Sequence, residues 1–381
     1  MPHRTTLATV TAVVLATALA APANAGTITA VDLGTLPGDT TSIATGINDA
    51  GTIVGHSYRH DGTTGKSFGT AVKWNAAGVI TRLPVPRADP ESTVFALNDA
   101  GTIIGDSIDA AGKRHALRWD PSGAVTPLAP LPGDVGTGAH HLTADGTVYG
   151  TSSSEHNNQR AVRWSRNGTP TQLENPFGAG LYSYITAVDG ANVLGYVTNA
   201  QGVITFVRWD ANGRSTPLLS TYLYPKQVNA SGVIAGWGDG FRGVLLKPGG
   251  TPIDVGASQS PTGINSAGRV IADQQPNWPL ATPVTWSPDG VLTALPLLPG
   301  NLNGSTADIN DAGVIVGAST TWTGPHTPVS RAVRWNPDLS VVVLEGPPGR
   351  TEATANALNE KGAIVGAAYG DGANHAVLWR G

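Results

Sequence analysis

Ile47-Asn48-Asp49-Ala50-Gly51-Thr52-Ile53-Val54-Gly55 is the stretch that decides the fold, because copies of it recur along the whole chain. The other copies end at residues 105, 150, 195, 236, 272, 317 and 366, so successive copies lie about 44 residues apart. A repeat of this length is typical of the blades of a β-propeller and is too long for most solenoids of short repeats.

A second motif follows the first and ends in a tryptophan in seven repeats, five of which have Lys or Arg before it, as in Ala116-Leu117-Arg118-Trp119. The fifth repeat departs from it with Val244-Leu245-Leu246-Lys247. Asn-Asp-Ala-Gly sequences favour tight turns, and runs of β-branched residues favour strands. Each repeat therefore predicts four short strands, named A to D here in chain order. The lack of a 3.6-residue apolar period predicts almost no helix.

The two ends of the chain predict how the ring closes. The eighth repeat stops at Gly381, before a strand D, whereas residues 28–34 resemble the strand D of the fifth repeat. We expect this N-terminal strand to complete the last blade, which removes two open sheet edges. The sequence thus predicts an all-β, closed eight-bladed β-propeller of four-stranded antiparallel blades, formed by residues 26–381 as a single domain.

Residues 1–25 have the pattern of a secretory signal peptide, with His3 and Arg4 before an apolar run and Ala23-Asn24-Ala25 as the cleavage site. The apolar run has about 15 residues, short of the roughly 20 that a spanning helix needs. We expect a secreted, extracellular monomer with no membrane attachment after cleavage. With no cysteine, its stability must come from burial and not from disulfides. A net charge of −4 without a basic patch argues against nucleic acid as a partner.

Several stretches resemble the extracellular repeat family called HAF. They are His115-Ala116-Leu117-Arg118-Trp119, His375-Ala376-Val377-Leu378-Trp379 and Asp32-Leu33-Gly34-Thr35-Leu36-Pro37-Gly38. The resemblance covers the whole mature chain and implies export and a propeller-like fold. It implies no reaction and no catalytic residue.

The repeated polar residues have structural and functional interpretations. The tryptophans are expected to pack between blades. A Lys or Arg precedes five of these tryptophans: Lys73, Arg118, Arg163, Arg208 and Arg334. These cations could form an anion-binding ring, but we expect them to pair with turn carboxylates of a neighbouring blade. The Asn-Asp stretches lack the alternating oxygen ligands of a calcium loop and are expected to be turns. His140 and His141 should point to opposite faces of a strand, so we expect no metal site and no cofactor.

Functional residues are expected where the repeat varies, in the D–A and B–C loops that share one rim of the ring. Three tryptophans fall outside the repeat position and are assigned to B–C loops of repeats five to seven: Trp237, Trp278 and Trp322. Tyr222 and Tyr224 lie in the loop before the fifth repeat. These rings suit stacking on a sugar or burial in a protein partner. Alternatively, each ring covers its own loop.

From these residues we expect a secreted, non-catalytic binding protein that engages a glycan or an extracellular protein through the variable rim. One alternative is a secreted polysaccharide hydrolase or lyase, which needs two facing carboxylates that the sequence cannot place. Another is a structural protein of the cell envelope. No Gly-x-Ser-x-Gly elbow, His-Glu-x-x-His motif or phosphate loop is present in the sequence.

Overall fold

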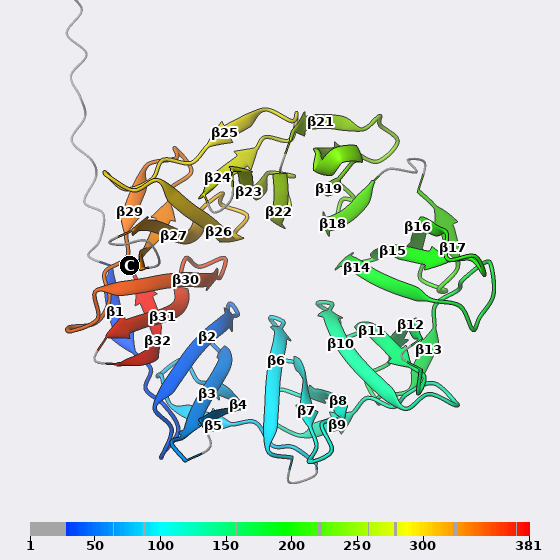
Figure 1. Ribbon diagram of the computed structural model, residues 1–381, viewed down its shortest axis with the longest axis horizontal. Coiled ribbons are helices and arrows are strands. Elements are labelled where there is room, and N and C mark those ends of the chain that lie inside the picture. Colours follow the sequence, from blue (N-terminus) through cyan, green and yellow to red (C-terminus); the bar gives the residue numbers. More distant parts are fainter. Residues whose placement is uncertain are drawn as a thin grey trace, which may run out of the picture.

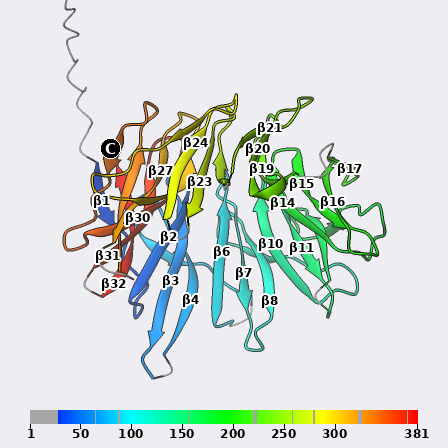
Figure 2. The ribbon, with the colours of Figure 1, turned by 45° about the horizontal axis from the view of Figure 1, so that its top comes forward.

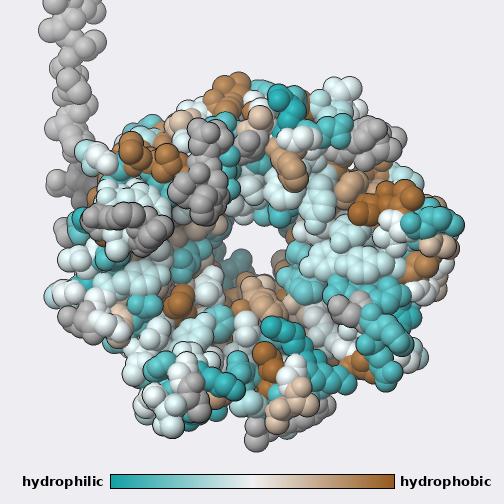
Figure 3. Space-filling model, viewed as in Figure 1, coloured by the Kyte–Doolittle hydropathy of each residue, from teal (hydrophilic) through white to brown (hydrophobic). Residues whose placement is uncertain are grey.

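The computed structural model describes residues 28–63, 65–86, 89–156, 158–218, 223–257, 259–277, 280–322, 327–370 and 372–381. The predicted signal peptide lies outside these residues. The chain forms a ring of eight four-stranded antiparallel sheets around a central opening (Figures 1 and 3), which confirms the predicted propeller. Among the described residues, the one helical segment is the short 3₁₀ turn η1 (Asp239–Phe241), and no helix could span a bilayer.

Strand A is innermost in every blade and strand D outermost (Figure 1). Blades 1 to 4 consist of β2 (Thr41–Ile47), β3 (Ile53–Asp61), β4 (Lys66–Trp74) and β5 (Ile80–Arg82); β6 (Glu91–Leu97), β7 (Ile103–Ile108), β8 (Arg114–Trp119) and β9 (Val125–Pro127); β10 (Gly136–Leu142), β11 (Val148–Ser153), β12 (Gln159–Trp164) and β13 (Pro170–Gln172); and β14 (Ser183–Asp189), β15 (Asn192–Thr198), β16 (Ile204–Trp209) and β17 (Ser215–Pro217).

Blades 5 to 8 consist of β18 (Tyr224–Val228), β19 (Ile234–Trp237), β20 (Gly243–Leu246) and β21 (Ile253–Gly256); β22 (Gln259–Ile264), β23 (Val270–Asn277), β24 (Leu280–Trp286) and β25 (Leu292–Ala294); β26 (Asn303–Ile309), β27 (Ile315–Trp322), β28 (Pro328–Trp335) and β29 (Val341–Val343); and β30 (Glu352–Leu358), β31 (Ile364–Gly370), β32 (Ala373–Arg380) and β1 (Thr29–Asp32). The longest B–C hairpin, of β3 and β4, projects beyond the rest of its rim (Figure 2).

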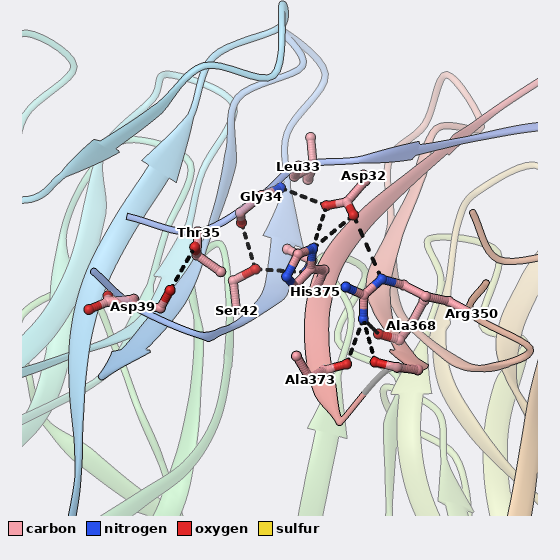
Figure 4. Close-up of polar contacts among 12 residues, drawn as sticks. Asp32, Leu33, Gly34, Thr35, Asp39, Ser42, Arg350, Ala368, Ala373 and His375 are labelled. Atoms are coloured by element: carbon pink, nitrogen blue, oxygen red, sulfur yellow. Dashed lines mark hydrogen bonds and ion pairs between the residues drawn. The ribbon is translucent and has the colours of Figure 1, made fainter. Parts of the chain in front are cut away.

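The ring closes as the sequence predicts, because β1 pairs antiparallel with β32, Thr29 lying opposite Arg380 and Asp32 opposite Val377. Figure 4 shows the polar contacts that hold this strand. The Asp32 carboxylate lies 2.8 Å from Nδ1 of His375 and 3.7 Å from Nε of Arg350. Ser42 Oγ of blade 1 donates to the Gly34 carbonyl and accepts the amide of Ala376. N- and C-terminal strands are thus joined to each other and to blade 1.

The Asn-Asp stretches are turns, as expected, and their asparagines also link neighbouring blades. Asn48 Oδ1 accepts the Thr52 amide within its own turn, while its Nδ2 donates to the Asn98 carbonyl of the next blade. Asn359 donates in the same way to the Asn48 carbonyl and so completes the circle. We call these side chains the asparagine belt: Asn48, Asn98, Asn192, Asn229, Asn265, Asn310 and Asn359.

The strand C tryptophans pack between blades, as predicted. All seven are fully buried: Trp74, Trp119, Trp164, Trp209, Trp286, Trp335 and Trp379. Six donate their Nε1–H to a carbonyl that follows strand D of the preceding blade, as Trp74 does to Leu33 at 2.8 Å. These six indoles thus bury a large apolar area and satisfy their one polar atom, whereas the buried Nε1 of Trp286 has no partner among the described residues.

The expected pairing of the preceding Lys or Arg with turn carboxylates is wrong for the arginines whose contacts are seen. Arg118 Nη1 donates to the Arg166 carbonyl, and Arg163 donates to the Ala211 carbonyl, each in the C–D turn of the next blade. Turn carbonyls are already fixed in position by the main chain, so a guanidinium with several donors can reach them whatever residue the turn carries.

Each strand A contains one β-bulge that the sequence did not predict. The register shifts at equivalent points in all eight blades, for example between Ala44 and Gly46 and between Ala139 and His141. A bulge adds one residue without a partner and turns the side chains after it. It therefore decides which side chains beside the central opening share a face.

Candidate functional site

Two of the five predicted site residues are in contact. Tyr224 is the first residue of β18 and lies opposite Trp237, the last residue of β19, with ring centroids 5.7 Å apart. Trp322 ends β27 of blade 7 and is 37% exposed, but has no ring contact with either of them. Tyr222 and Trp278 lie outside the described residues. Trp237 and Trp322 each end a strand B and Tyr224 begins a strand A, so the assignment of these three residues to loops is wrong. Ligand binding by them stays a prediction.

Tyr224 and Trp237 belong to a larger group that we call the aromatic row: Tyr182, Tyr184, Tyr196, Phe206, Tyr224, Trp237 and Phe241. The strand register of blade 4 explains how three of these rings come together. Tyr184 on β14 lies opposite Tyr196 on β15, which lies opposite Phe206 on β16. Residues directly opposite each other in a sheet share a face. Three rings therefore cross one face of blade 4.

Blade 5 supplies three further rings of the row: Tyr224, Trp237 and Phe241. Tyr224 lies 6.2 Å from Tyr196 and 5.5 Å from Phe206, the latter in an edge-to-face arrangement. Trp237 is half-buried and is fixed by its Nε1–H, which donates to the Gln259 carbonyl of blade 6 at 2.6 Å. Phe241 in η1 is 70% exposed and ends the row. The joint between blades 4 and 5 thus presents a continuous aromatic surface that is only partly covered.

One cation faces this surface. Lys226, the bulge residue of β18, places its ammonium 4.7 Å from the ring centroid of Trp237 and 6.0 Å from that of Tyr224. This distance is within the range of cation–π attraction. Among the described side chains, no carboxylate lies within ion-pair distance of Lys226. Burial raises the pKa of Tyr196, and neighbouring tyrosines add to this, so Tyr196 stays neutral at ordinary pH.

An open pocket of about 640 Å³ adjoins the row at Tyr184. Its lining includes His140, Gln159, Lys113, Arg114 and Glu155. The His140 ring lies 5.7 Å from that of Tyr184. Row and pocket therefore form one surface across blades 2 to 5, apolar at one end and carrying ionisable side chains at the other.

The expectation that His140 and His141 point to opposite faces is wrong, because the bulge of β10 falls between Ala139 and His141. Both contact blade 4: His140 through Tyr184, and His141 through a hydrogen bond with the main chain of Ile185. Burial, with a smaller contribution from His140, lowers the pKa of His141 to about 4. In the described part of the chain, no three metal-binding side chains come together.

Sequence analysis missed Tyr184, Tyr196 and Phe206, although one position could have indicated them. The residue after the strand B glycine varies among the repeats, being His56, Asp106, Thr151, Tyr196 and Trp237 in blades 1 to 5. The residues around it repeat. A variable position inside an otherwise repeated motif is where a ligand can be recognised without loss of the fold.

Fold and site define a β-propeller with an aromatic site at one joint. No family model and no curated protein matches the sequence. Solved structures do match. A puromycin-hydrolysing peptidase of Mycobacterium tuberculosis is 13% identical with a TM-score of 0.50, covering 88% of this chain and 59% of that one. An acylaminoacyl peptidase of Pyrococcus horikoshii is 10% identical with a TM-score of 0.53, covering 86% of this chain and 57% of that one.

A further acylaminoacyl peptidase, in complex with Z-Gly-Gly-Phe-chloromethyl ketone, is 9% identical with a TM-score of 0.52 and covers 86% of this chain and 58% of that one. The chain thus spans less than three fifths of the length of these peptidases. At such identities the likeness establishes the fold alone. Because the matched structures are peptidases, they contradict the expected non-catalytic protein that binds a glycan or another extracellular partner.

Proposed function

We propose that the chain is a peptide-binding propeller of the architecture found in peptidases, and that the aromatic row holds an aromatic side chain of the peptide. The observation that carries the proposal is the continuous row of half-buried rings at the joint of blades 4 and 5. Aromatic rings contribute to binding through a large apolar area and through edge-to-face contacts with another ring.

The main chain beside the row favours an extended ligand. β14 and β18 are the first strands of their sheets and are paired on one side only. Their free edges border the central opening (Figure 1). An extended peptide can add to such an edge through main-chain hydrogen bonds while its side chains enter neighbouring pockets. Lys226, on β18 itself, favours a peptide with an acidic group beside its aromatic residue.

The matched peptidases support the ligand class. One of them was solved with Z-Gly-Gly-Phe-chloromethyl ketone, a blocked peptide that ends in phenylalanine. We also propose, on the sequence pattern of residues 1–25, that the chain is exported, which N-terminal sequencing of the mature protein tests directly.

The test is a calorimetric titration of the purified chain with acetyl-Gly-Gly-Phe amide and with its alanine analogue. We expect the phenylalanine peptide to bind at least about tenfold more tightly, and the Y196A/Y224A variant to lose this preference. The matched control is F95A, because Phe95 is also exposed (44%) on a strand A but lies outside the row. Equal affinity for both peptides, or the same loss in F95A, would contradict the proposal. Chromatography of the incubated peptide reports any hydrolysis.

A further inference from the structure

The joint between blades 4 and 5 has a second unusual feature, beside the A–B and C–D turns of blade 5. In other blades the strand C tryptophan lies opposite the residue two positions before the strand B glycine or alanine, as Trp74 lies opposite Ile53. In blade 5 the residue opposite Ile234 is Leu246. Leu246, and not Lys247 as the sequence alignment suggested, thus takes the place of the tryptophan.

Leu246 leaves this joint incompletely filled. The leucines that follow strand D are buried where a tryptophan packs on them, with exposures of 1% for Leu83, 3% for Leu128 and 1% for Leu173. The equivalent Leu218, which faces Leu246, is only partly buried. Leu223 fills some of the space, since its Cδ1 is the nearest side-chain atom to the Gly236 position, which a tryptophan ring covers in blades 2 and 4.

The part of this joint that neither Leu246 nor Leu223 fills is a groove of about 360 Å³, which we call the blade 4–5 groove. Pro217, Leu218, Ile234, Leu246 and Pro252 supply much of its lining. Arg208 and Lys247 also line it. Its volume lies within the range of small-molecule pockets, and an apolar cavity that water solvates poorly accepts apolar ligands of matching shape.

We propose that the blade 4–5 groove binds a small planar aromatic molecule of the size of indole. The argument for this occupant is the chain itself, which fills the corresponding place with an indole ring at the seven other joints. A ring in the groove would cover the exposed part of Leu218 as Trp119 covers Leu83. Arg208 adds a cation that favours the face of a ring. The site is separate from the aromatic row, so it does not depend on peptide binding.

The probe is 5-fluoroindole, observed by ¹⁹F NMR as the intact folded chain is added. We expect saturable broadening of the fluorine signal with the native sequence. The variant L246W restores the missing ring and should abolish the broadening. T216W places a ring at the exposed mouth of the groove without altering the core, and should weaken binding about tenfold. T171W is the matched control, because Thr171 lies opposite Arg163 in blade 3 as Thr216 lies opposite Arg208.

Each outcome either supports the groove as the binding site or overturns it. No saturable broadening with the native chain would overturn the proposal, and so would equal binding by T216W and T171W. If L246W fails to fold by circular dichroism, T216W still decides the question. Loss of binding in Y196A/Y224A but not in T216W would assign the probe to the aromatic row and would also overturn the groove as the site.

Discussion

At one rim of the ring, where the A–B and C–D turns lie, each blade is tied to the next by an asparagine amide or an arginine that donates to main-chain carbonyls. Seven joints have a member of the asparagine belt, and the joint between blades 3 and 4 has Arg163 instead. At the other rim, half-buried rings and an open pocket occupy blades 2 to 5. The hydrogen bonds of the turn rim maintain the ring, and the loop rim carries the surface that we propose binds a peptide.

This difference between the two rims explains why the repeat keeps the same residues in the turns and varies at the loop rim. Replacing a belt asparagine such as Asn48 leaves the Thr52 amide without its partner and removes the hydrogen bond to the next blade, which costs about 1–3 kcal/mol. A ring that is half-exposed can change at little cost in stability. Variation therefore accumulates where it affects a ligand and not the fold.

The largest expected effect comes from opening the ring. A chain that starts at residue 37 lacks β1 and Leu33, whose carbonyl accepts the Trp74 indole. Losing a buried leucine, this hydrogen bond and four paired residues should lower the free energy of unfolding by roughly 5 kcal/mol relative to a chain that starts at Gly26. Urea denaturation followed by tryptophan fluorescence measures the difference. Identical midpoints for the two chains would show that β1 does not hold the ring.

A smaller effect concerns Asp308 on β26, whose carboxylate accepts the amides of Ile309 and, across the joint, Leu358. Burial raises its pKa from 3.8 to about 6, against the opposing effect of these hydrogen bonds. Because the folded state holds the proton more tightly than the unfolded one, stability is lost as pH rises from about 4 to 6. The loss amounts to about 3 kcal/mol.

The variant D308N removes this titration. The difference in unfolding free energy between D308N and the native chain should therefore grow in favour of D308N as pH rises from 4 to 7. D338N is the control, because a hydrogen bond from Ser340 lowers the pKa of exposed Asp338 and so gives the opposite sign. Parallel pH curves for D308N and the native chain would refute the assignment.

The asparagine belt predicts the next effect in size. N359A removes the amide that donates to the Asn48 carbonyl and the oxygen that accepts the Ala363 amide. We expect a loss of about 2 kcal/mol, because the Ala363 amide loses its partner and the Asn48 carbonyl keeps only the hydrogen bond from the Gly51 amide. N98A, at a joint far from the chain ends, should cost about the same. A much smaller loss for N359A in urea denaturation would mean that the closing joint is looser than the others.

Much of the fold could be predicted from the sequence, because each repeat encodes its own strands and turns. The position of β1, the turn role of Asn48 and the packing of Trp74 all follow from local pattern and periodicity. The partners of Arg118 and Arg163 could not be predicted, since a guanidinium can reach either a carboxylate or a carbonyl. The bulge that brings His140 and His141 to one side depends on the geometry of the inner strand, which the repeat pattern does not show.

The aromatic row was predicted only at Tyr224 and Trp237. Tyr196 and Phe206 lie within strands that look regular in the sequence, and their contact with Tyr224 arises from the packing of two blades. Loop position was a misleading guide, because Trp237 ends a strand. The sequence does not show the strand register, which determines the residues that lie opposite each other. The register also shows that Leu246, and not Lys247, occupies the tryptophan position of blade 5.

Photo-crosslinking tests most directly that the peptide binds at the loop rim of blades 4 and 5 and not at the turn rim. An acetyl-Gly-Gly peptide amide that ends in p-benzoylphenylalanine is irradiated with the chain, and the labelled residues are identified by mass spectrometry. The account predicts saturable labelling within residues 182–241, reduced by competing acetyl-Gly-Gly-Phe amide. Labelling confined to the asparagine belt and its turns, or labelling that the competitor leaves unchanged, would contradict it.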